Sequence, residues 1–317
     1  NQQDRVYLEF ESYIDQIEVS KINQNIPNML ANTEGARWID EVLTEGILTN
    51  IMLTTRFNMS GGIESPNTKF SANLNGAKIN VNSDWPSIED FDAKVTFSND
   101  YLKIVGNKAS IEEIDLSYLS ITTKDFNQPD AVLSINGRFN SQSTKIARFI
   151  QQSSVTSNIK SYLDEFELVG KLWGNVNLVI PFQKNSNQKA KITFDMFASD
   201  NSLSLVSPEL KIDGFSSQFS FSDGLIRTKG KGFIGGELFQ LSLNPKEWID
   251  EKKKPFSVKL SHLNSSTDAY ITKNSSNQWQ STIESDSLKA NLGLTVDDNG
   301  KNFIQLTGLN IKNFENV

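Results

Sequence analysis

Cysteine is absent from the 317 residues of this sequence, and histidine occurs only once. The absence of cysteine excludes disulfide bonds, thiolate metal sites and cysteine nucleophiles. It also suits a chain that crosses an oxidising compartment, because no thiol is present that could mispair. The single histidine, His262, cannot by itself form a multi-histidine metal site. We therefore expect His262 to be an ordinary residue of the strand-like segment "FSVKLSHLN" (256–264).

Positive charge is scarce as well. The chain has 31 Lys and Arg residues against 38 Asp and Glu residues, which gives a net charge of −7 at pH 7. A nucleic-acid-binding protein needs clustered basic residues to displace the counterions of phosphates, so the charge argues against this class of protein. The basic run Lys252 to Lys254 follows Asp250 and Glu251 and is typical of a solvated loop.

Long apolar runs are missing. No stretch approaches the roughly 20 residues that a membrane-spanning helix needs, and no charged segment followed by an apolar one opens the chain as in a signal peptide. The first residues, "NQQDRVYLEF" (1–10), already have the pattern of a strand. We therefore expect the chain to be a segment of a longer protein.

The composition is that of a globular protein. Hydrophobic residues make up 37% of the chain and charged residues 22%, with 18 glycines and 8 prolines. Such a chain can bury the core of one long domain or of two ordinary ones, and it does not have the composition of a disordered protein.

The sequence repeats itself at an offset of 124 residues. The segments "ARWIDEVLTEGILTN" (36–50) and "IKSYLDEFELVGKLWGN" (159–175) have the same layout, and the offset then continues without a gap. The matched pairs are Trp38 with Tyr162, Asp40 with Asp164, Glu41 with Glu165, Gly46 with Gly170, Leu48 with Leu172, Phe70 with Phe194, Phe91 with Phe215, Phe97 with Phe221, Ser98 with Ser222 and Gly106 with Gly230. One register held this long indicates an internal duplication, and repeated units of this kind usually stack edge to edge.

A third unit begins after residue 260. The segment "LKANLGLTV" (288–296) repeats "LWGNVNLVI" (172–180) at an offset of 116 residues. We predict one continuous repeat array over residues 1–317, with unit 1 at about 22–139, unit 2 at about 140–262 and a partial third unit at 263–317.

Hydrophobic alternation predicts antiparallel strands within each unit. "AKINVNS" (77–83), "DAKVTFS" (92–98), "KITFDMF" (191–197), "SLSLV" (202–206) and "SQFSFS" (217–222) each place apolar residues at every second position. Turn signals such as "SNDY" (98–101), "SDG" (222–224) and "IGGE" (234–237) separate these runs. Short spacing between strands favours antiparallel meanders.

Two helices are expected. One covers about Thr33 to Thr44, with Gly46 just past its end, and the other covers roughly Ser143 to Phe166, broken near "SSVTS" (153–157). Two helices cannot cover about fourteen strands. The strands therefore form either two facing sheets or one sheet that curls and leaves an apolar trough partly open.

Four parts of the sequence carry a further pattern, namely "RWIDEVLTEGILTNIMLTTRF" (37–57), "LVGKLWGNVNLVIPF" (168–182), "AKINVNSDWPSIEDFDAKVTFSNDYLKIVG" (77–106) and the closing "WQSTIESDSLKANLGLTV" (279–296) with "FIQLTGLNI" (303–311). In these segments the chain resembles the YhdP family, within the AsmA-like and TamB-like superfamily. The second unit keeps Pro181-Phe182 after its strand, where the first unit has Phe57-Asn58. The resemblance covers nearly the whole chain.

The resemblance implies a fold and a function. It implies a mainly β fold of tandem antiparallel meander repeats, forming a long curved, half-pipe or taco-like sheet with an apolar inner face and a few short helices. It also implies a periplasmic segment of an inner-membrane-anchored protein in a Gram-negative envelope. Such a segment would be a non-enzymatic conduit that passes phospholipid between the inner and outer membranes, needs no cofactor, contacts both membranes through other regions and can bind envelope proteins.

An acyl chain needs an unbroken apolar lane, because each methylene exposed to water costs about 0.8 kcal/mol. The residues that we expect to line this lane are Ile79, Val81, Val95, Phe97, Leu133, Ile135, Leu178, Ile180, Ile192, Phe194, Met196, Leu203, Leu205, Phe219, Phe221, Leu241 and Leu243. The alternative is a structural or protein-interaction scaffold, in which these residues form a sealed core. Which face of each strand lines the lane is open, because a slip of one residue exchanges the two faces.

Catalytic interpretations have less support. The pairs Asp40-Glu41, Asp164-Glu165 and Glu112-Glu113 are adjacent in sequence, and adjacent residues of a helix point in different directions. "GFIGGE" (232–237) is better interpreted as a bulge or a tight hairpin turn than as a phosphate-binding loop. "DDNG" (297–300) lacks the other ligands of a calcium loop and predicts a turn.

Overall fold

The structure is a computed structural model of the chain. It describes residues 6–21, 42–59, 67–80, 86–98, 101–124, 128, 131–152, 163, 165–181, 190–205, 210–222, 225–243, 256–273, 279–286, 288–296 and 302–311.

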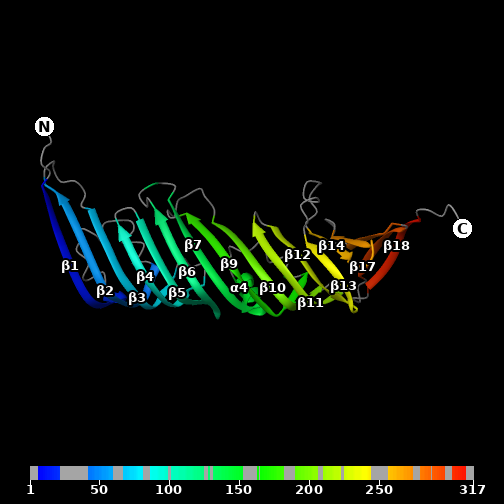
Figure 1. Cartoon of the computed structure of the whole chain (residues 1–317), viewed down its shortest axis with the longest axis horizontal. Coiled ribbons are helices and arrows are strands. Elements are labelled where there is room, and N and C mark those ends of the chain that lie inside the picture. Colours follow the sequence, from blue (N-terminus) through cyan, green and yellow to red (C-terminus); the bar gives the residue numbers. More distant parts are fainter. Residues whose placement is uncertain are drawn as a thin grey trace, which may run out of the picture. The chain divides into compact units, whose positions relative to one another are not determined.

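The described residues form an antiparallel sheet of 18 strands that is not closed into a barrel, with one α-helix and one short 3-10 helix (Figure 1). The predicted mainly β fold is confirmed. In chain order the elements are β1 (Tyr7–Glu18), η1 (Val19–Lys21), β2 (Leu43–Asn58), β3 (Asn67–Ile79), β4 (Ile88–Ser98), β5 (Tyr101–Ile111), β6 (Ile114–Lys124), β7 (Val132–Gln142), α4 (Ser143–Gln152), β8 (Phe166–Val169), β9 (Lys171–Pro181), β10 (Lys191–Leu205), β11 (Leu210–Ser222), β12 (Leu225–Ile234), β13 (Glu237–Leu243), β14 (Phe256–His262), β15 (Asp268–Lys273), β16 (Trp279–Glu284), β17 (Leu288–Val296) and β18 (Asn302–Ile311).

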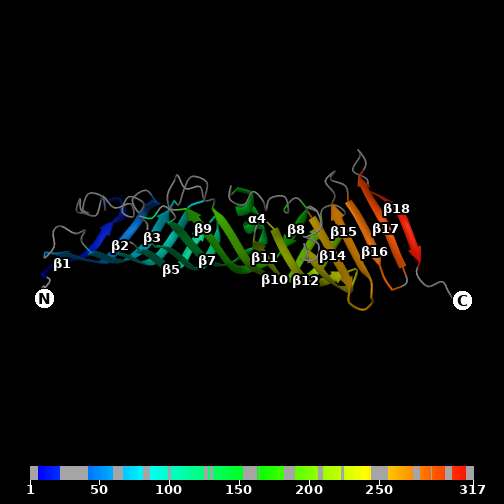
Figure 2. The ribbon, with the colours of Figure 1, turned by 90° about the horizontal axis from the view of Figure 1, so that it is seen from above.

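Strands that follow one another in sequence pair with one another. Strands β1 to β7 pair in chain order, and β10 to β18 do the same. Figure 2 shows the same succession of strands from a second direction. Each of these pairings is antiparallel and joins neighbouring strands through a short connection or a loop, as a meander requires.

The chain divides into two compact units, each of which is described by itself. Unit 1 comprises Asn1–Ser141, Gln152–Val155 and Asn175–Ile192, and unit 2 comprises Gln142–Gln151, Thr156–Gly174 and Thr193–Val317. In terms of elements, β1 to β7 belong to unit 1, whereas β8, β11 to β18 and nearly all of α4 and β10 belong to unit 2.

The 124-residue offset of the sequence recurs in the boundaries of the strands. Strand β3 begins at Asn67 and β10 at Lys191, and β5 begins at Tyr101 and β12 at Leu225. The pairing register repeats too. Phe70 stands opposite Phe97 in unit 1, and the residues 124 positions later, Phe194 and Phe221, stand opposite each other in unit 2. The exact ranges expected for the three repeat units stay a prediction.

Both units bend their strands with the same pair of bulges. Gly76 and Asp90 have φ angles of +57° and +51° in unit 1, and the residues 124 positions later, Asp200 and Gly214, have +56° and +59°. The left-handed conformation favours glycine and tolerates aspartate. Each unit therefore carries one glycine and one aspartate at these bulges. The glycine comes first in unit 1, and the aspartate comes first in unit 2.

The predicted first helix falls mainly on residues outside those that the structure describes, and its end was placed wrongly. Leu43 and Thr44 lie in β2, and Gly46 lies inside the same strand with a φ of +126°. Gly46 does not cap a helix. A side chain at this position would come within 2.9 Å of Ala77 Cα, so the glycine permits close contact between β2 and β3.

The first part of the second predicted helix is present as α4, and most of the remainder falls outside the described residues. Residues 153–162 lie outside the described part of the chain, and Phe166 begins β8 instead of ending a helix. Ser143 fixes the start of α4 to unit 2. Its backbone N–H donates to Gly170 O at 2.8 Å, and its Oγ donates to Leu168 O at 2.5 Å.

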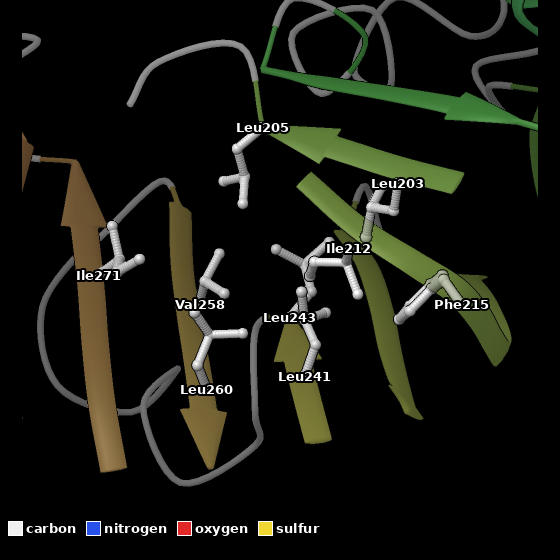
Figure 3. Packing of buried hydrophobic residues seen from close by; sticks show 9 residues of the cluster. All are labelled: Leu203, Leu205, Ile212, Phe215, Leu241, Leu243, Val258, Leu260 and Ile271. Carbon is white, nitrogen blue, oxygen red and sulfur yellow. The ribbon is translucent and has the colours of Figure 1, made fainter. Parts of the chain in front are cut away.

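Unit 2 contains a compact apolar cluster. Side chains from β10 and β11 and from β13, β14 and β15 point toward one another (Figure 3). The cluster consists of Leu203, Leu205, Ile212, Phe215, Leu241, Leu243, Val258, Leu260 and Ile271. The cluster therefore packs together side chains from strands that are not all neighbours within the sheet of this unit.

Candidate functional site

The candidate site is the apolar face of the sheet, which we call the inner face. Residues directly opposite each other on antiparallel strands point to the same side of the sheet, so the pairing register shows which side chains stand together. In unit 1 a row runs across β3 to β7 through Ala72, Val95, Ile104, Ile121 and Ile135. All five are at most 7% exposed, so this row is apolar and buried over five successive strands.

A second row of unit 1 lies two residues nearer to the edge of the sheet at which β3, β5 and β7 begin and β4 and β6 end. It passes from Phe70 through Phe97, Leu102 and Thr123 to Leu133. Thr123 is the polar member of this row and is only 2% exposed. The two rows together give unit 1 a continuous apolar band that crosses the strands.

Unit 2 has rows of the same kind. One passes across β13 to β17 through Leu241, Leu260, Ala269, Ile283 and Ala290. Leu241, Leu260 and Ala290 are buried, and the other two side chains are half-buried. This inner-face row of unit 2 is therefore apolar from β13 to β17.

The inner face becomes accessible at β1 and at β18. On β1, Phe10 is 56% exposed and Ile14 stands opposite the buried Ile51 of β2. On β18, Leu309 is 55% exposed and stands opposite the buried Ala290 of β17. Apolar side chains of the inner face can thus be reached from solvent at one strand of each unit.

Most of the expected lining residues lie on the buried positions of the two units. Val81 lies outside the described residues, and Ile180 and Phe219 are half-buried. The others are buried, namely Ile79, Val95, Phe97, Leu133, Ile135, Leu178, Ile192, Phe194, Met196, Leu203, Leu205, Phe221, Leu241 and Leu243. That these residues contact lipid stays a prediction.

Several inner-face residues were not predicted. Ile104 and Ile121 complete the row between Val95 and Ile135. Their segments, "LKIVG" (102–106) and "LSIT" (119–122), alternate between apolar and polar residues in the same way as the segments from which strands were predicted, such as "DAKVTFS" (92–98). The signal was therefore present in the sequence. The sequence did not show that these residues form one row, because the row depends on the register in which neighbouring strands pair.

The opposite face, which we call the outer face, carries polar residues and ion pairs. Lys259 Nζ lies 2.8 Å from Asp268 Oδ2, and the Tyr270 hydroxyl donates to the same carboxylate at 3.3 Å. The hydrogen bond to Asp268 raises the pKa of Lys259. Burial acts to raise the pKa of Asp268, but the hydrogen bonds from Lys259 and Ser261 outweigh it, so the pKa of this carboxyl is lowered.

A second ion pair lies on the outer face of unit 1. Lys78 Nζ lies 3.0 Å from Glu89 Oε1, and Ser87 Oγ donates to the same oxygen at 3.1 Å. The hydrogen bond from Lys78 lowers the pKa of Glu89, and the same contact raises the pKa of Lys78.

The residues that the sequence analysis considered as candidates for catalysis or metal binding occupy ordinary structural positions. His262 ends β14, where its Nδ1 lies 2.7 Å from Ser265 Oγ and its ring packs edge-on against Phe239. Glu112 and Glu113 form the turn between β5 and β6 with φ angles of +49° and +65°. Asp40, Glu41, Asp164 and "DDNG" lie outside the described residues.

The glycine-rich segment "GFIGGE" is a hairpin turn, as predicted. Gly235 and Gly236 have φ angles of +59° and +88°, and Ile234 pairs with Glu237 across them. Two-residue hairpin loops favour residues with positive φ, for which glycine has no steric penalty. Within the described ranges, no group of His, Cys, Asp and Glu residues could hold a metal ion, and no helix is long and apolar enough to span a membrane.

Comparison with known proteins gives one decisive result. The family model described as "YhdP protein" matches residues 1–313. The chain belongs to the YhdP family. This confirms the family expected from the Trp-containing and Gly-x-Leu segments of the sequence. No curated protein and no solved structure matches this YhdP-family chain.

Proposed function

We propose that this chain is a non-enzymatic segment of a phospholipid conduit, which holds acyl chains against the inner face. The observation that carries the proposal is the succession of apolar cross-strand rows in each unit, such as the row from Ala72 to Ile135. Membership of the YhdP family is consistent with this role and with a place in the cell envelope.

The physical requirement for such a conduit is simple. Each methylene of an acyl chain gains about 0.8 kcal/mol when it leaves water for an apolar surface. A lipid that moves along the sheet must keep this gain at every step, because a polar gap would act as a barrier. Rows that cross five strands without a charged side chain meet the requirement.

The proposal includes the setting in which the conduit works. The segment would lie in the periplasm, between the inner and outer membranes, and would contact these membranes through other regions of an inner-membrane-anchored protein. Its ligands are phospholipid acyl chains, and envelope proteins are candidate partners. No part of the proposed function uses nucleic acid or a chemical reaction.

A sealed structural or protein-interaction scaffold is the second candidate. The compact cluster around Leu205, Phe215 and Val258 favours it, because these side chains are at most 1% exposed and already pack against protein. The accessible apolar side chains on β1 and β18 favour the conduit instead. The two candidates differ in one measurable respect, since only the conduit binds lipid.

The test is extraction of the purified chain with denaturing solvent, followed by mass spectrometry of lipids, before and after incubation with liposomes. The conduit predicts phospholipid in stoichiometric amount, and much less in folded Phe97→Asp and Phe221→Asp variants. Thr96→Asp and Ser220→Asp are the matched controls, because these residues precede the two phenylalanines and lie on the outer face. Absence of lipid from the parent chain, even after incubation, would reject the conduit in favour of the scaffold.

A further inference from the structure

We propose that a phospholipid bound to this chain lies with its phosphate at one particular rim of the sheet, which we call the basic rim. In unit 1 this rim is formed by the ends at which β3 and β5 begin and β4 and β6 end. In unit 2 it is formed by the corresponding ends, at which β10 and β12 begin and β11 ends. The inference deepens the proposed function and rests on it.

The charged residues that the structure describes on β3 to β7 are segregated between the two ends of these strands. In the half of β3 to β7 nearer to the basic rim, the described residues include no Asp or Glu, whereas Lys69, Lys94 and Lys103 lie there with exposed side chains. The opposite half, which we call the acidic rim, carries Lys78, Lys108 and Arg138 together with Glu89, Asp90, Asp92, Glu112, Glu113 and Asp115. Among the described residues of β3 to β7, one rim therefore carries net positive charge and the other net negative charge.

Unit 2 shows the same bias. Near its basic rim, β10 and β12 carry three basic residues, Lys191, Arg227 and Lys229, and one acidic residue, Asp195. Near the other rim, three acidic residues lie on β10, β11 and β13, namely Asp200, Asp213 and Glu237. Two basic residues lie near the same rim, Lys211 on β11 and Lys231 on β12. Arg227 stands 124 residues after Lys103, so the two units place a cation at the same position of the repeat.

Two buried polar atoms without a hydrogen-bond partner lie at this same rim. Within the described part of the chain, buried side-chain atoms of this kind are Thr123 Oγ1 and Arg227 Nε, of which only Thr123 Oγ1 lies on the inner face, since Arg227 stands opposite the outer-face residue Ser220. Thr123 is one residue from the end of β6, and Arg227 is two residues from the start of β12. Buried polar atoms are nearly always paired in folded proteins, so an unpaired one calls for a ligand or another specific cause.

The position of Thr123 suits a particular part of a lipid. Its side chain belongs to the inner-face row between Leu102 and Leu133, and it is 2% exposed. A glycerophospholipid carries its ester carbonyls between the acyl chains and the phosphate. A hydroxyl that lies on the apolar face just inside the rim can donate a hydrogen bond to an ester carbonyl, while the phosphate lies at the rim itself.

The basic residues act on the phosphate through their field. The lysines of unit 1 point from the outer face, so they need not touch the phosphate directly. Charges interact over a Debye length of about 8 Å at physiological salt, which is comparable to the thickness of a strand with its side chains. Neutralising these lysines is expected to weaken the preference for a phosphate-bearing lipid, and added salt is expected to do the same.

The experiment measures which lipids the full chain takes up from vesicles that contain equal amounts of phosphatidylglycerol and diacylglycerol with identical acyl chains. Lipids are extracted from the re-isolated protein and quantified by mass spectrometry. The parent chain is expected to take up severalfold more phosphatidylglycerol, and K69Q/K103Q is expected to lose most of this preference. K78Q/K108Q removes the same charge from the acidic rim and is expected to behave as the parent chain does.

Thr123 is tested with T123V, which removes the hydroxyl and leaves a side chain of similar shape. Vesicles that contain ester-linked and ether-linked phosphatidylglycerol are compared, because an ether linkage has no carbonyl to accept a hydrogen bond. The parent chain is expected to prefer the ester-linked lipid, and T123V is expected to show no preference. An equal preference in T123V and the parent chain would overturn the role of this hydroxyl.

The other outcomes separate this inference from the proposed function. If the parent chain takes up no lipid, the conduit itself is rejected and the rim assignment with it. If the parent chain takes up lipid and K69Q/K103Q keeps the full preference, only the rim assignment is overturned. Saturable binding of inorganic phosphate that leaves lipid uptake unchanged would assign the rim to free phosphate and would also overturn the inference.

Discussion

Phe215 occupies the space in which a side chain of Gly230 would otherwise lie. A methyl group on Gly230 would come within 2.8 Å of Phe215 Cε2, and Phe215 is fully buried. The same relationship occurs 124 residues earlier, where a methyl group on Gly106 would come within 2.5 Å of Phe91 Cε2. In each unit a glycine of one strand thus makes room for a phenylalanine ring from the neighbouring strand.

The first prediction concerns this packing. Gly230→Ala is expected to lower the free energy of unfolding by about 1–3 kcal/mol, because the added methyl group overpacks a closed site. Gly293→Ala is the control, since the nearest atom to its added methyl group would be 3.7 Å away. Urea denaturation followed by circular dichroism measures both. Equal effects of the two substitutions would contradict the packing described here.

The second prediction concerns the bulges. Asp200→Gly is expected to leave stability unchanged or to raise it by up to about 1 kcal/mol, because glycine adopts a φ of +56° without a steric cost. Asp200→Val is expected to be clearly destabilising, since a β-branched residue is a genuine outlier at positive φ. The Gly76→Asp substitution imports the residue that unit 2 has at this position and should be tolerated. Melting temperatures of the three variants check the order.

The third prediction uses the absence of cysteine, since a single introduced cysteine gives a unique label. Phe10→Cys and Tyr13→Cys place a polarity-sensitive fluorophore on opposite faces of β1, at positions that are 56% and 63% exposed in the natural chain. On addition of phospholipid vesicles, the probe at position 10 is expected to shift to the blue. The probe at position 13 should not change. Identical responses at both positions would show that lipid does not distinguish the two faces.

The fourth prediction concerns pH and the Lys259–Asp268 ion pair. The pKa of Asp268 is lowered in the folded protein, so its contribution to stability is present above about pH 4, its ordinary range, and is lost as pH falls through the folded pKa. The pKa of Lys259 is raised, so its contribution is present below about pH 10.4 and is lost as pH rises through the folded pKa. Both side chains are about one-third exposed, which keeps the effect below about 1 kcal/mol.

The variant Asp268→Asn tests this prediction. It is expected to be slightly less stable than the parent chain at pH 7, and this difference should shrink at pH 2, because the contribution of the Asp268 carboxylate is lost as pH falls through its lowered pKa. Denaturant midpoints at the two pH values give the comparison. A difference between variant and parent that persists unchanged at pH 2 would mean that Asp268 acts through packing and not through its charge.

Much of the β architecture could be predicted from the sequence. The alternation of Ile192, Phe194 and Met196 shows which residues of β10 share a face, because successive side chains of a strand point to opposite sides. The offset between Phe97 and Phe221 predicts that the same local structure occurs twice, and the pairing registers bear this out. Local patterns of this kind need no knowledge of distant parts of the chain.

The candidate site was less accessible to sequence reasoning. The segments that contain Ile104 and Ile121 alternate clearly, yet only the pairing of β5 with β6 puts these two residues in one row. The basic rim could not be foreseen either. Lys69 and Lys103 are 34 positions apart, and they share a rim only because β3 and β5 run in the same direction on either side of β4.

The residue pattern alone was enough to predict the mainly β fold, the family, a repeat at an offset of 124 residues and the residues of each strand that face the same way. The role of Gly46, which the sequence analysis placed after a helix, and of its repeat partner Gly170 became clear only from the pairing of the strands, because both glycines lie within or beside strands. A helix end and a β-bulge both favour a glycine with positive φ, so the local signal is the same. The difference comes from residues some 30 positions away, Ala77 and Asn201, whose close approach leaves no room for a side chain.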